Sequence, residues 1–129
     1  ADRLKAKLSN GCVFVNLWAT WCEPCLIELP ALVRYLDKKK KVIPVIIDVS
    51  MSSERKKSSQ KVLDSIPTPF ETFFKPDGKD EEYIVTVDKE WQGALPFSLL
   101  FVDGVKKKVW NGPMVPADLE KATKQYCKL

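Results

Sequence analysis

Two short apolar runs, separated by a stretch with helical periodicity, define the first half of the chain. Residues 12–18 (Cys-Val-Phe-Val-Asn-Leu-Trp) and residues 42–49 are nearly continuous and rich in β-branched or aromatic residues, which is typical of strands covered on both faces. Between them, over residues 23–38, apolar side chains recur at helical spacing, at Leu26, Ile27, Leu29, Leu32, Val33 and Leu36. This order predicts a parallel strand pair with a right-handed crossover.

The next helical segment is more polar. Residues 52–66 predict a surface helix whose apolar edge consists of Val62, Leu63 and Ile66. In the preceding helix, Pro24 lies in the first turn, where proline is tolerated, whereas Pro30 lies inside the pattern and is expected to kink it.

Prolines interrupt regular structure between Pro67 and Trp91. Pro67, Pro69 and Pro76-Asp-Gly78 fall in this stretch, and residues 83–87 fit either a short strand or a packed loop. The stretch is expected to cover a sheet edge, with a substrate groove as the alternative. Its aromatic residues Phe70, Phe73, Phe74 and Tyr83 would contribute to either one.

The last third of the chain predicts a β-hairpin and a helix. Residues 97–102 and 105–110 flank Asp103-Gly104, which tolerates the positive φ of a tight turn. From Pro116 the apolar or small residues fit an amphipathic helix. The expected fold class is α/β, a central mixed β-sheet flanked by helices, with a β-α-β amino-terminal part and a β-hairpin-α carboxy-terminal part.

Length and composition fit one domain. With 129 residues and 45% apolar residues, residues 1–129 are expected to form a single domain with one sizeable core. No apolar run approaches the roughly 20 residues of a membrane span, and no signal-peptide stretch begins the chain. The chain as given is expected to be soluble, and it is compatible with a trimmed form or with a membrane anchor outside these residues.

The charged residues give little functional information. The net charge is +4 with no histidine, and lysine runs occur at residues 38–41, 56–57 and 106–108 without interleaved aromatics. Such runs favour solvated faces. A docking surface for an acidic partner is the alternative, and nucleic-acid binding is not expected.

The strongest chemical signal is the segment Trp18-Ala-Thr-Trp-Cys-Glu-Pro-Cys25. It places Cys22 where a strand ends and a helix begins, and Cys25 one turn into that helix, so that both sulfurs lie on one side. Free backbone N–H groups and the positive end of the helix dipole favour a thiolate at Cys22. Cys22 is therefore the expected nucleophile and Cys25 the resolving thiol. Half of a zinc or iron–sulfur site is the alternative, but it would need further ligands; no metal and no cofactor are expected.

This segment, with Val-Phe-Val-Asn-Leu before it, resembles the thioredoxin superfamily, and in particular its TlpA/ResA-like branch of extracytoplasmic oxidoreductases. Residues 91–103 resemble that branch's passage through a cis-proline into the hairpin. The resemblance implies a thioredoxin fold with Pro96 as the cis-proline beside the disulfide and the backbone of Leu95 offered to substrates. Trp21 and Glu23 would shape the surface around Cys22, and Pro24 would tune the stability of its thiolate.

One position departs from thioredoxin itself. Where thioredoxin has a buried aspartate beneath the disulfide, this chain has Asn16, so the proton acceptor for Cys25 is missing there. Members of the resembled branch use a glutamate, for which Glu54 is the candidate after the second strand. A solvated surface residue is the alternative for Glu54.

Two further cysteines lie near the ends of the chain. In a thioredoxin fold, Cys12 and Cys127 would both lie on the side opposite the active site, where they could form a structural disulfide. Two separate buried thiols are the alternative.

The expected function is dithiol–disulfide exchange, with Cys22 attacking a substrate disulfide and Cys25 releasing the mixed disulfide. Reduction of extracytoplasmic protein partners is favoured over disulfide donation; the alternatives are a thiol peroxidase and a non-catalytic binding module. The expected partners are protein thiols and disulfides and an upstream thiol electron donor. The chain is expected to be a monomer in the periplasm or another extracytoplasmic space, with membrane tethering allowed.

Overall fold

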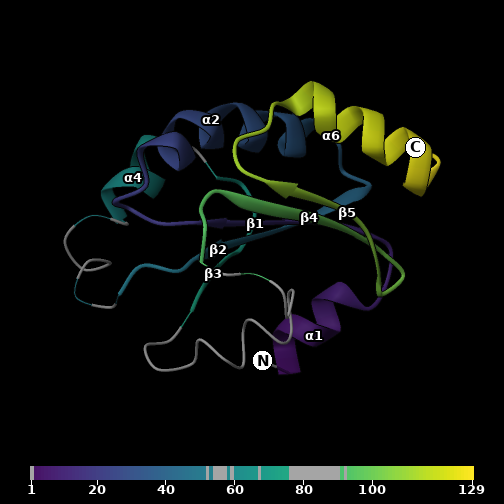
Figure 1. The fold of residues 1–129 in the computed structure, drawn as a ribbon, viewed down its shortest axis with the longest axis horizontal. Coiled ribbons are helices and arrows are strands. Elements are labelled where there is room, and N and C mark those ends of the chain that lie inside the picture. The colour runs from purple at the N-terminus through teal and green to yellow at the C-terminus, as the bar shows by residue number, and fades with distance from the viewer. Residues whose placement is uncertain are drawn as a thin grey trace.

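A five-stranded mixed sheet forms the centre of the molecule (Figure 1). The computed structural model describes residues 2–51, 53, 58, 60–66, 68–75, 91 and 93–129. The strand order is β3-β2-β1-β4-β5, with β1, β2 and β3 parallel and β4 and β5 antiparallel to their neighbours. The strands are β1 Cys12–Trp18, β2 Val42–Asp48, β3 Thr72–Phe74, β4 Phe97–Val102 and β5 Val105–Asn111.

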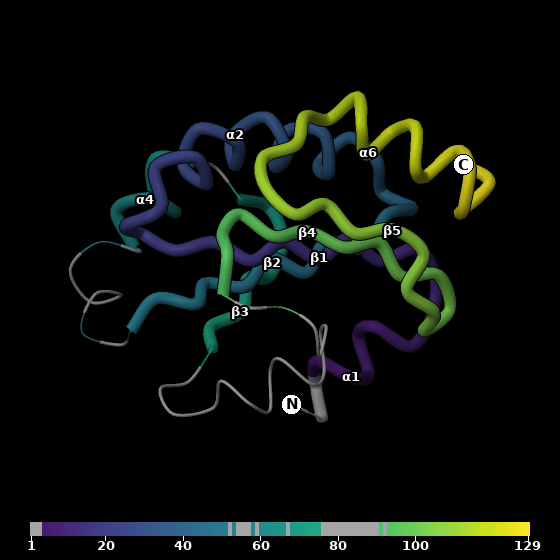
Figure 2. The backbone as a smooth tube through the Cα atoms, viewed as in Figure 1, coloured from purple at the N-terminus to yellow at the C-terminus, as the bar shows by residue number. Residues whose placement is uncertain are grey.

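Helices cover both faces of the sheet (Figures 1 and 2). On one face lie α2 (Glu23–Lys38), α4 (Gln60–Ser65) and α6 (Pro116–Ala122), and α6 continues into a π-helical turn, η2 (Thr123–Cys127). On the other face lies α1 (Asp2–Leu8). Within the described residues, no helix combines the length and the apolarity needed to cross a bilayer.

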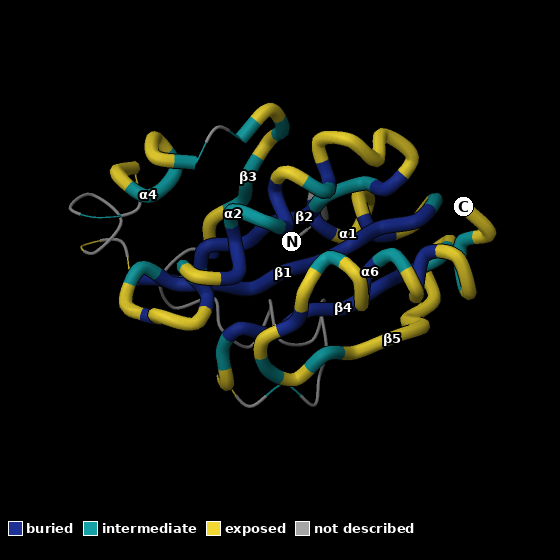
Figure 3. Tube along the Cα trace, turned by 90° about the horizontal axis from the view of Figure 1, so that it is seen from above, coloured by how far each residue is buried: buried dark blue, intermediate teal, exposed yellow. Residues whose placement is uncertain are grey.

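The central strand β1 is buried along its whole length (Figure 3). Because successive side chains of a strand point to opposite faces, Phe14 and Trp18 pack in the cluster beneath α2 and α6, whereas Val13, Val15 and Leu17 pack in the cluster on the α1 side. Asn16 has the same parity as Phe14 and Trp18. The strand therefore directs a polar side chain toward α2, into an apolar layer.

The hairpin β4–β5 turns at Asp103 and Gly104, both of which have positive φ, at 49° and 84°. The Asp103 side chain accepts a hydrogen bond from the Gly11 backbone N–H at 2.8 Å, and the Asp103 backbone N–H donates to the Gly11 carbonyl at 2.9 Å. These two bonds fasten the hairpin to the turn before β1.

The predicted fold class, a mixed sheet flanked by helices, is confirmed. The order β-α-β, then hairpin, then helix is present, and α2 runs on past Pro30. Of the predicted helix over 52–66, the structure describes α4, Ile66 and positions 53 and 58. The remaining positions up to 59 lie outside the described residues, as do Pro67 and residues 83–87.

One element is not predicted, and one expectation is wrong. No pattern predicts a helix before β1, yet α1 packs Leu4 and Leu8 against the sheet. Residues 72–74 were expected in a loop covering a sheet edge, but they form the edge strand β3 itself, paired in parallel with β2. A strand of three residues between prolines is too short to show a periodic pattern, which explains the error.

Candidate active site

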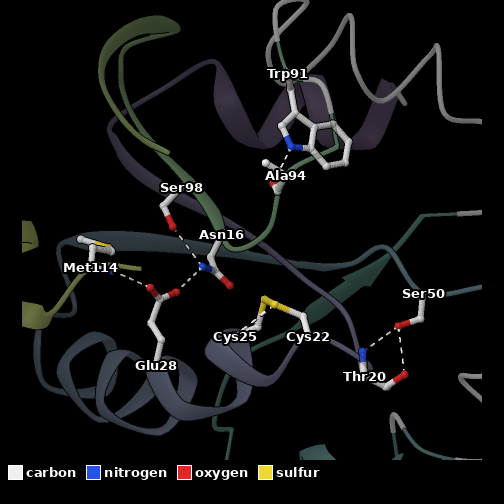
Figure 4. Close-up of a disulfide and its surroundings, with 10 residues drawn as sticks. All are labelled: Asn16, Thr20, Cys22, Cys25, Glu28, Ser50, Trp91, Ala94, Ser98 and Met114. Atoms are coloured by element: carbon white, nitrogen blue, oxygen red, sulfur yellow. Dashed lines mark hydrogen bonds between the residues drawn. A yellow bond between two sulfur atoms is a disulfide. The ribbon is translucent and has the colours of Figure 1, made fainter. Parts of the chain in front are cut away.

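Cys22 and Cys25 form a disulfide at the junction between β1 and α2, with 5.3 Å between their Cα atoms (Figure 4). Cys22 is the N-cap residue of α2, and its sulfur accepts a hydrogen bond from the Cys25 backbone N–H at 3.3 Å. A helix N-terminus presents unpaired N–H groups and a positive dipole end. This position therefore favours a thiolate on Cys22 once the disulfide is reduced.

The loop before Cys22 is fixed to the end of β2. The Thr20 backbone N–H donates to the Ser50 hydroxyl at 2.9 Å, and the Val49 backbone N–H donates to the Trp18 carbonyl at 2.8 Å. Trp18 itself is buried. The disulfide thus sits on a braced turn rather than on a free loop.

Exposed apolar side chains lie next to Cys22 and along α2. Trp21, next to Cys22, is 61% exposed, and Ile27 is 73% exposed on the outer side of α2. Beside the first turns of α2 lies an apolar groove of about 440 Å³. Its lining comes from α2 and from the segment between β5 and α6, and includes Glu23, Pro24, Ile27, Ala31, Met114 and Val115.

The Leu95–Pro96 peptide bond is cis. Pro96 is buried directly before β4, and its carbonyl accepts a hydrogen bond from the Gly112 backbone N–H at 3.1 Å. On the other side of Leu95, the Trp91 indole N–H donates to the Ala94 carbonyl at 2.8 Å, and the Trp91 ring lies 6.1 Å from that of Phe97. The segment entering β4 is therefore held from two directions.

A buried polar network lies beneath the disulfide (Figure 4). The Asn16 Nδ2 donates to Glu28 Oε1 and to Ser98 Oγ, each at 3.0 Å, and the Met114 backbone N–H donates to Glu28 Oε2 at 2.7 Å. The network therefore joins β1, α2, β4 and the segment before α6 at one point.

Burial raises the pKa of the Glu28 carboxyl above its ordinary value of 4.5, while the hydrogen bonds from Met114 and Asn16 act in the opposite direction. Glu28 is thus a buried acid one helical turn after Cys25. Sequence reasoning overlooked it, although an acid flanked by Leu29 and Leu32 on the buried side of an amphipathic helix was a usable signal.

The structure describes only some of the remaining candidate residues. Glu54, the candidate proton acceptor, lies outside the described residues and stays a prediction. Glu23 and Pro24 lie in the first turn of α2. Among the described residues, no group of three or more metal-ligating side chains gathers around Cys22 and Cys25 or elsewhere.

Cys12 and Cys127 are joined in a second disulfide, with 5.8 Å between their Cα atoms and a sequence separation of 115. Cys12 begins β1 and Cys127 ends η2. Because Cys22 follows the other end of β1, the two disulfides lie at opposite ends of the same strand.

Comparison with known proteins relates this site to named relatives. The chain is 30% identical over 108 residues to the thiol-disulfide oxidoreductase ResA of Oceanobacillus iheyensis, a match covering 68% of this chain and 53% of that protein. The chain thus spans about half the length of that relative. It is 32% identical over 78 residues to a thioredoxin of Listeria monocytogenes, covering 60% of this chain and 71% of the thioredoxin.

Solved structures agree on the fold. The thioredoxin-related protein of Neisseria meningitidis serogroup B superposes with a TM-score of 0.73 at 26% identity, covering 92% of this chain and 86% of that one. No protein-family model matches the chain.

Proposed function

The chain belongs to the thioredoxin superfamily, and on that premise we propose that it is a thiol–disulfide oxidoreductase whose redox couple is Cys22 and Cys25. The observation that carries the proposal is the Cys22–Cys25 disulfide at the N-terminus of α2. The similarity to a protein named thiol-disulfide oxidoreductase supports it.

In the proposed reaction, the Cys22 thiolate attacks one sulfur of a substrate disulfide. A Cys22–substrate disulfide forms, and the other substrate sulfur leaves as a thiolate that takes a proton. The Cys25 thiol then attacks the Cys22 sulfur, which forms the Cys22–Cys25 disulfide and releases the second substrate thiol, with the Cys25 proton balancing the leaving thiolate. Two electrons pass to the substrate, and an upstream thiol donor must restore the dithiol.

We propose protein disulfides as the substrate class. Trp21, next to Cys22, and Ile27, on α2, expose apolar surface, and such surface suits a polypeptide partner. The Leu95 backbone, next to the cis-proline, is the proposed pairing edge for an extended substrate segment.

We propose an extracytoplasmic location. The Cys12–Cys127 disulfide supports this, because structural disulfides form and persist in oxidising compartments. Location in a reducing compartment would be indicated if the protein, isolated with thiol trapping from its native cells, had Cys12 and Cys127 free.

The test of activity is disulfide reduction in insulin with dithiothreitol as the electron source. Wild type should accelerate reduction, Cys22→Ser should abolish the acceleration, and Cys25→Ser should trap a mixed disulfide through Cys22. The matched control is Cys12→Ala/Cys127→Ala, which leaves the proposed couple intact and should keep the activity. Activity retained by Cys22→Ser would contradict the proposal.

The direction of the reaction is proposed to be reductive, and the equilibrium reduction potential of the Cys22–Cys25 pair tests it. A value near −270 mV, about that of thioredoxin, supports a reductase. A value near −120 mV, about that of a strong disulfide donor, would reverse the direction.

A further inference from the structure

The side-chain oxygen of Asn16 is a buried acceptor that lacks a hydrogen-bond partner among the described residues. Asn16 has no solvent exposure. Its nitrogen is fully used, since the two N–H groups have two acceptors, Glu28 Oε1 and Ser98 Oγ. Buried polar atoms are nearly always hydrogen-bonded, so an orphaned one requires an explanation.

The network fixes the direction of this oxygen. The Asn16 nitrogen donates to both Glu28 Oε1 and Ser98 Oγ, so the oxygen on the other branch of the amide faces away from Glu28. Figure 4 shows the Asn16 oxygen on the side of the disulfide and the nitrogen on the side of Glu28 and Ser98. Asn16 also faces α2 because of its parity in β1, and Cys25, only 1% exposed, lies on that helix.

The sulfurs of a disulfide carry no proton to donate to this oxygen. Reduction by two electrons and two protons breaks the Cys22–Cys25 bond and gives each sulfur one proton, which Cys22 can then lose from its position at the helix N-terminus. The Cys25 thiol then becomes a buried donor on the side of the Asn16 oxygen, which lacks a hydrogen-bond partner among the described residues.

We propose that Asn16 is a positioning residue for the redox couple, and that its Oδ1 accepts a hydrogen bond from the Cys25 thiol when the disulfide is reduced. This inference rests on the proposed function. Asn16 takes a hydrogen bond and not the proton, which stays on Cys25 until the resolving step and leaves with the substrate thiol.

Two consequences follow from this assignment. The bond exists only in the dithiol form, so Asn16 favours that form over the disulfide. A hydrogen bond to the neutral thiol also opposes its ionisation, so Asn16 keeps Cys25 protonated while Cys22 is the thiolate. The network therefore gives the two cysteines different protonation states in the reduced protein, with Cys25 as the thiol and Cys22 as the thiolate.

The first test compares Asn16→Leu, which removes the acceptor and preserves approximate size, with Ser98→Ala, which removes one partner of Nδ2 and leaves Oδ1 in place. In Asn16→Leu the dithiol–disulfide equilibrium should shift about tenfold toward the disulfide, which is about 30 mV for a two-electron couple. Ser98→Ala should shift it less than about twofold. Equal shifts in the two variants would overturn the proposal.

A second measurement separates the oxygen from the charge of Glu28. The Asn16→Leu shift should persist at about tenfold when both proteins also carry Glu28→Met, because that background lacks the carboxylate charge and offers the Asn16 oxygen no new donor. Disappearance of the shift in this background would assign the effect to Glu28 and overturn the role of the Asn16 oxygen.

A third measurement needs no change at the buried asparagine, and so decides the matter if Asn16→Leu does not fold. In Cys22→Ala, which leaves no hydroxyl or thiol beside Cys25, the infrared S–H stretching band of Cys25 should lie at lower frequency than in the urea-unfolded chain, as expected for a bonded thiol. An unshifted band would overturn the proposal. Loss of insulin reduction tests the proposed function separately, since neither the equilibrium nor the S–H band requires a substrate.

Discussion

The two disulfides lie at opposite ends of β1, and the proposed redox pair is not the more exposed of the two. Cys22 and Cys25 are 5% and 1% exposed, whereas Cys12 is 7% exposed and Cys127 is half-buried. What differs is the surroundings: Cys22 caps a helix of 16 residues and adjoins exposed Trp21, whereas Cys12 joins a strand to the end of the last helical turn. The comparison indicates that the position of Cys22 at a helix N-terminus and the polar groups nearby, rather than exposure of the sulfur, make the Cys22–Cys25 bridge the one suited to thiol–disulfide exchange.

Chain connectivity separates the two bridges further. The Cys12–Cys127 bridge spans 115 positions and the Cys22–Cys25 bridge spans 3. In the chain-entropy model, a bridge stabilises the fold by restricting the unfolded chain, and the effect grows with the length of the closed loop. The distal bridge is thus suited to stabilise the fold, while the proximal one can open at little cost in stability.

The largest predicted effect concerns the distal bridge. Cys12→Ala/Cys127→Ala should lower the free energy of unfolding by about 2–5 kcal/mol, because nearly the whole chain loses its cross-link. Urea unfolding without reductant measures this. Cys22→Ala/Cys25→Ala is the matched pair, with an expected loss of about 2 kcal/mol or less. Equal losses in the two pairs would contradict the division of roles.

Local sequence features predict Cys22 and Cys25 as the redox pair. The polar network beneath them depends on contacts between distant parts of the chain, which local features do not show. A strand end followed by a helix start places Cys22 and Cys25 from a few neighbouring residues. Glu28 is different, because its two oxygens are held by Asn16 and by Met114, which is 86 positions away. No pattern within the helix reveals such partners.

The same reasoning explains the errors in the fold. The strong patterns are a continuous apolar run in β1, helical periodicity over the 16 residues of α2, and a turn dipeptide with specific chemistry in the hairpin. In contrast, α1 is a helix of seven residues, about two turns, and β3 has three residues. Neither is long enough to show a clear periodicity, and packing on the sheet stabilises them. Short elements at the edges of a fold are therefore the least predictable.

The next prediction tests whether the surface around Cys22 serves substrate binding. Trp21→Ala should lower kcat/KM for insulin reduction about tenfold, because exposed aromatic residues commonly dominate the binding energy of an interface. Its free energy of unfolding should change by about 0.5 kcal/mol or less, as for surface positions generally. Val105→Ala is the control, since Val105 is 54% exposed at the hairpin near the distal bridge, and it should leave kcat/KM unchanged. Similar losses in both variants would remove the distinction between the two ends.

The smallest expected effect is a change in the pH dependence of stability caused by Glu28. Burial raises the pKa of Glu28 in the folded protein above 4.5, so the folded state holds the proton more tightly than the unfolded state. The stabilisation is complete below 4.5 and is lost as the pH rises through the folded pKa. In Glu28→Gln this decline should be weaker, because the amide does not ionise, and urea unfolding of the oxidised protein at a series of pH values measures it. Glu120→Gln, at the surface of α6, should decline as wild type does. If Glu28→Gln declines equally, the buried acid does not control stability at the active-site end of β1.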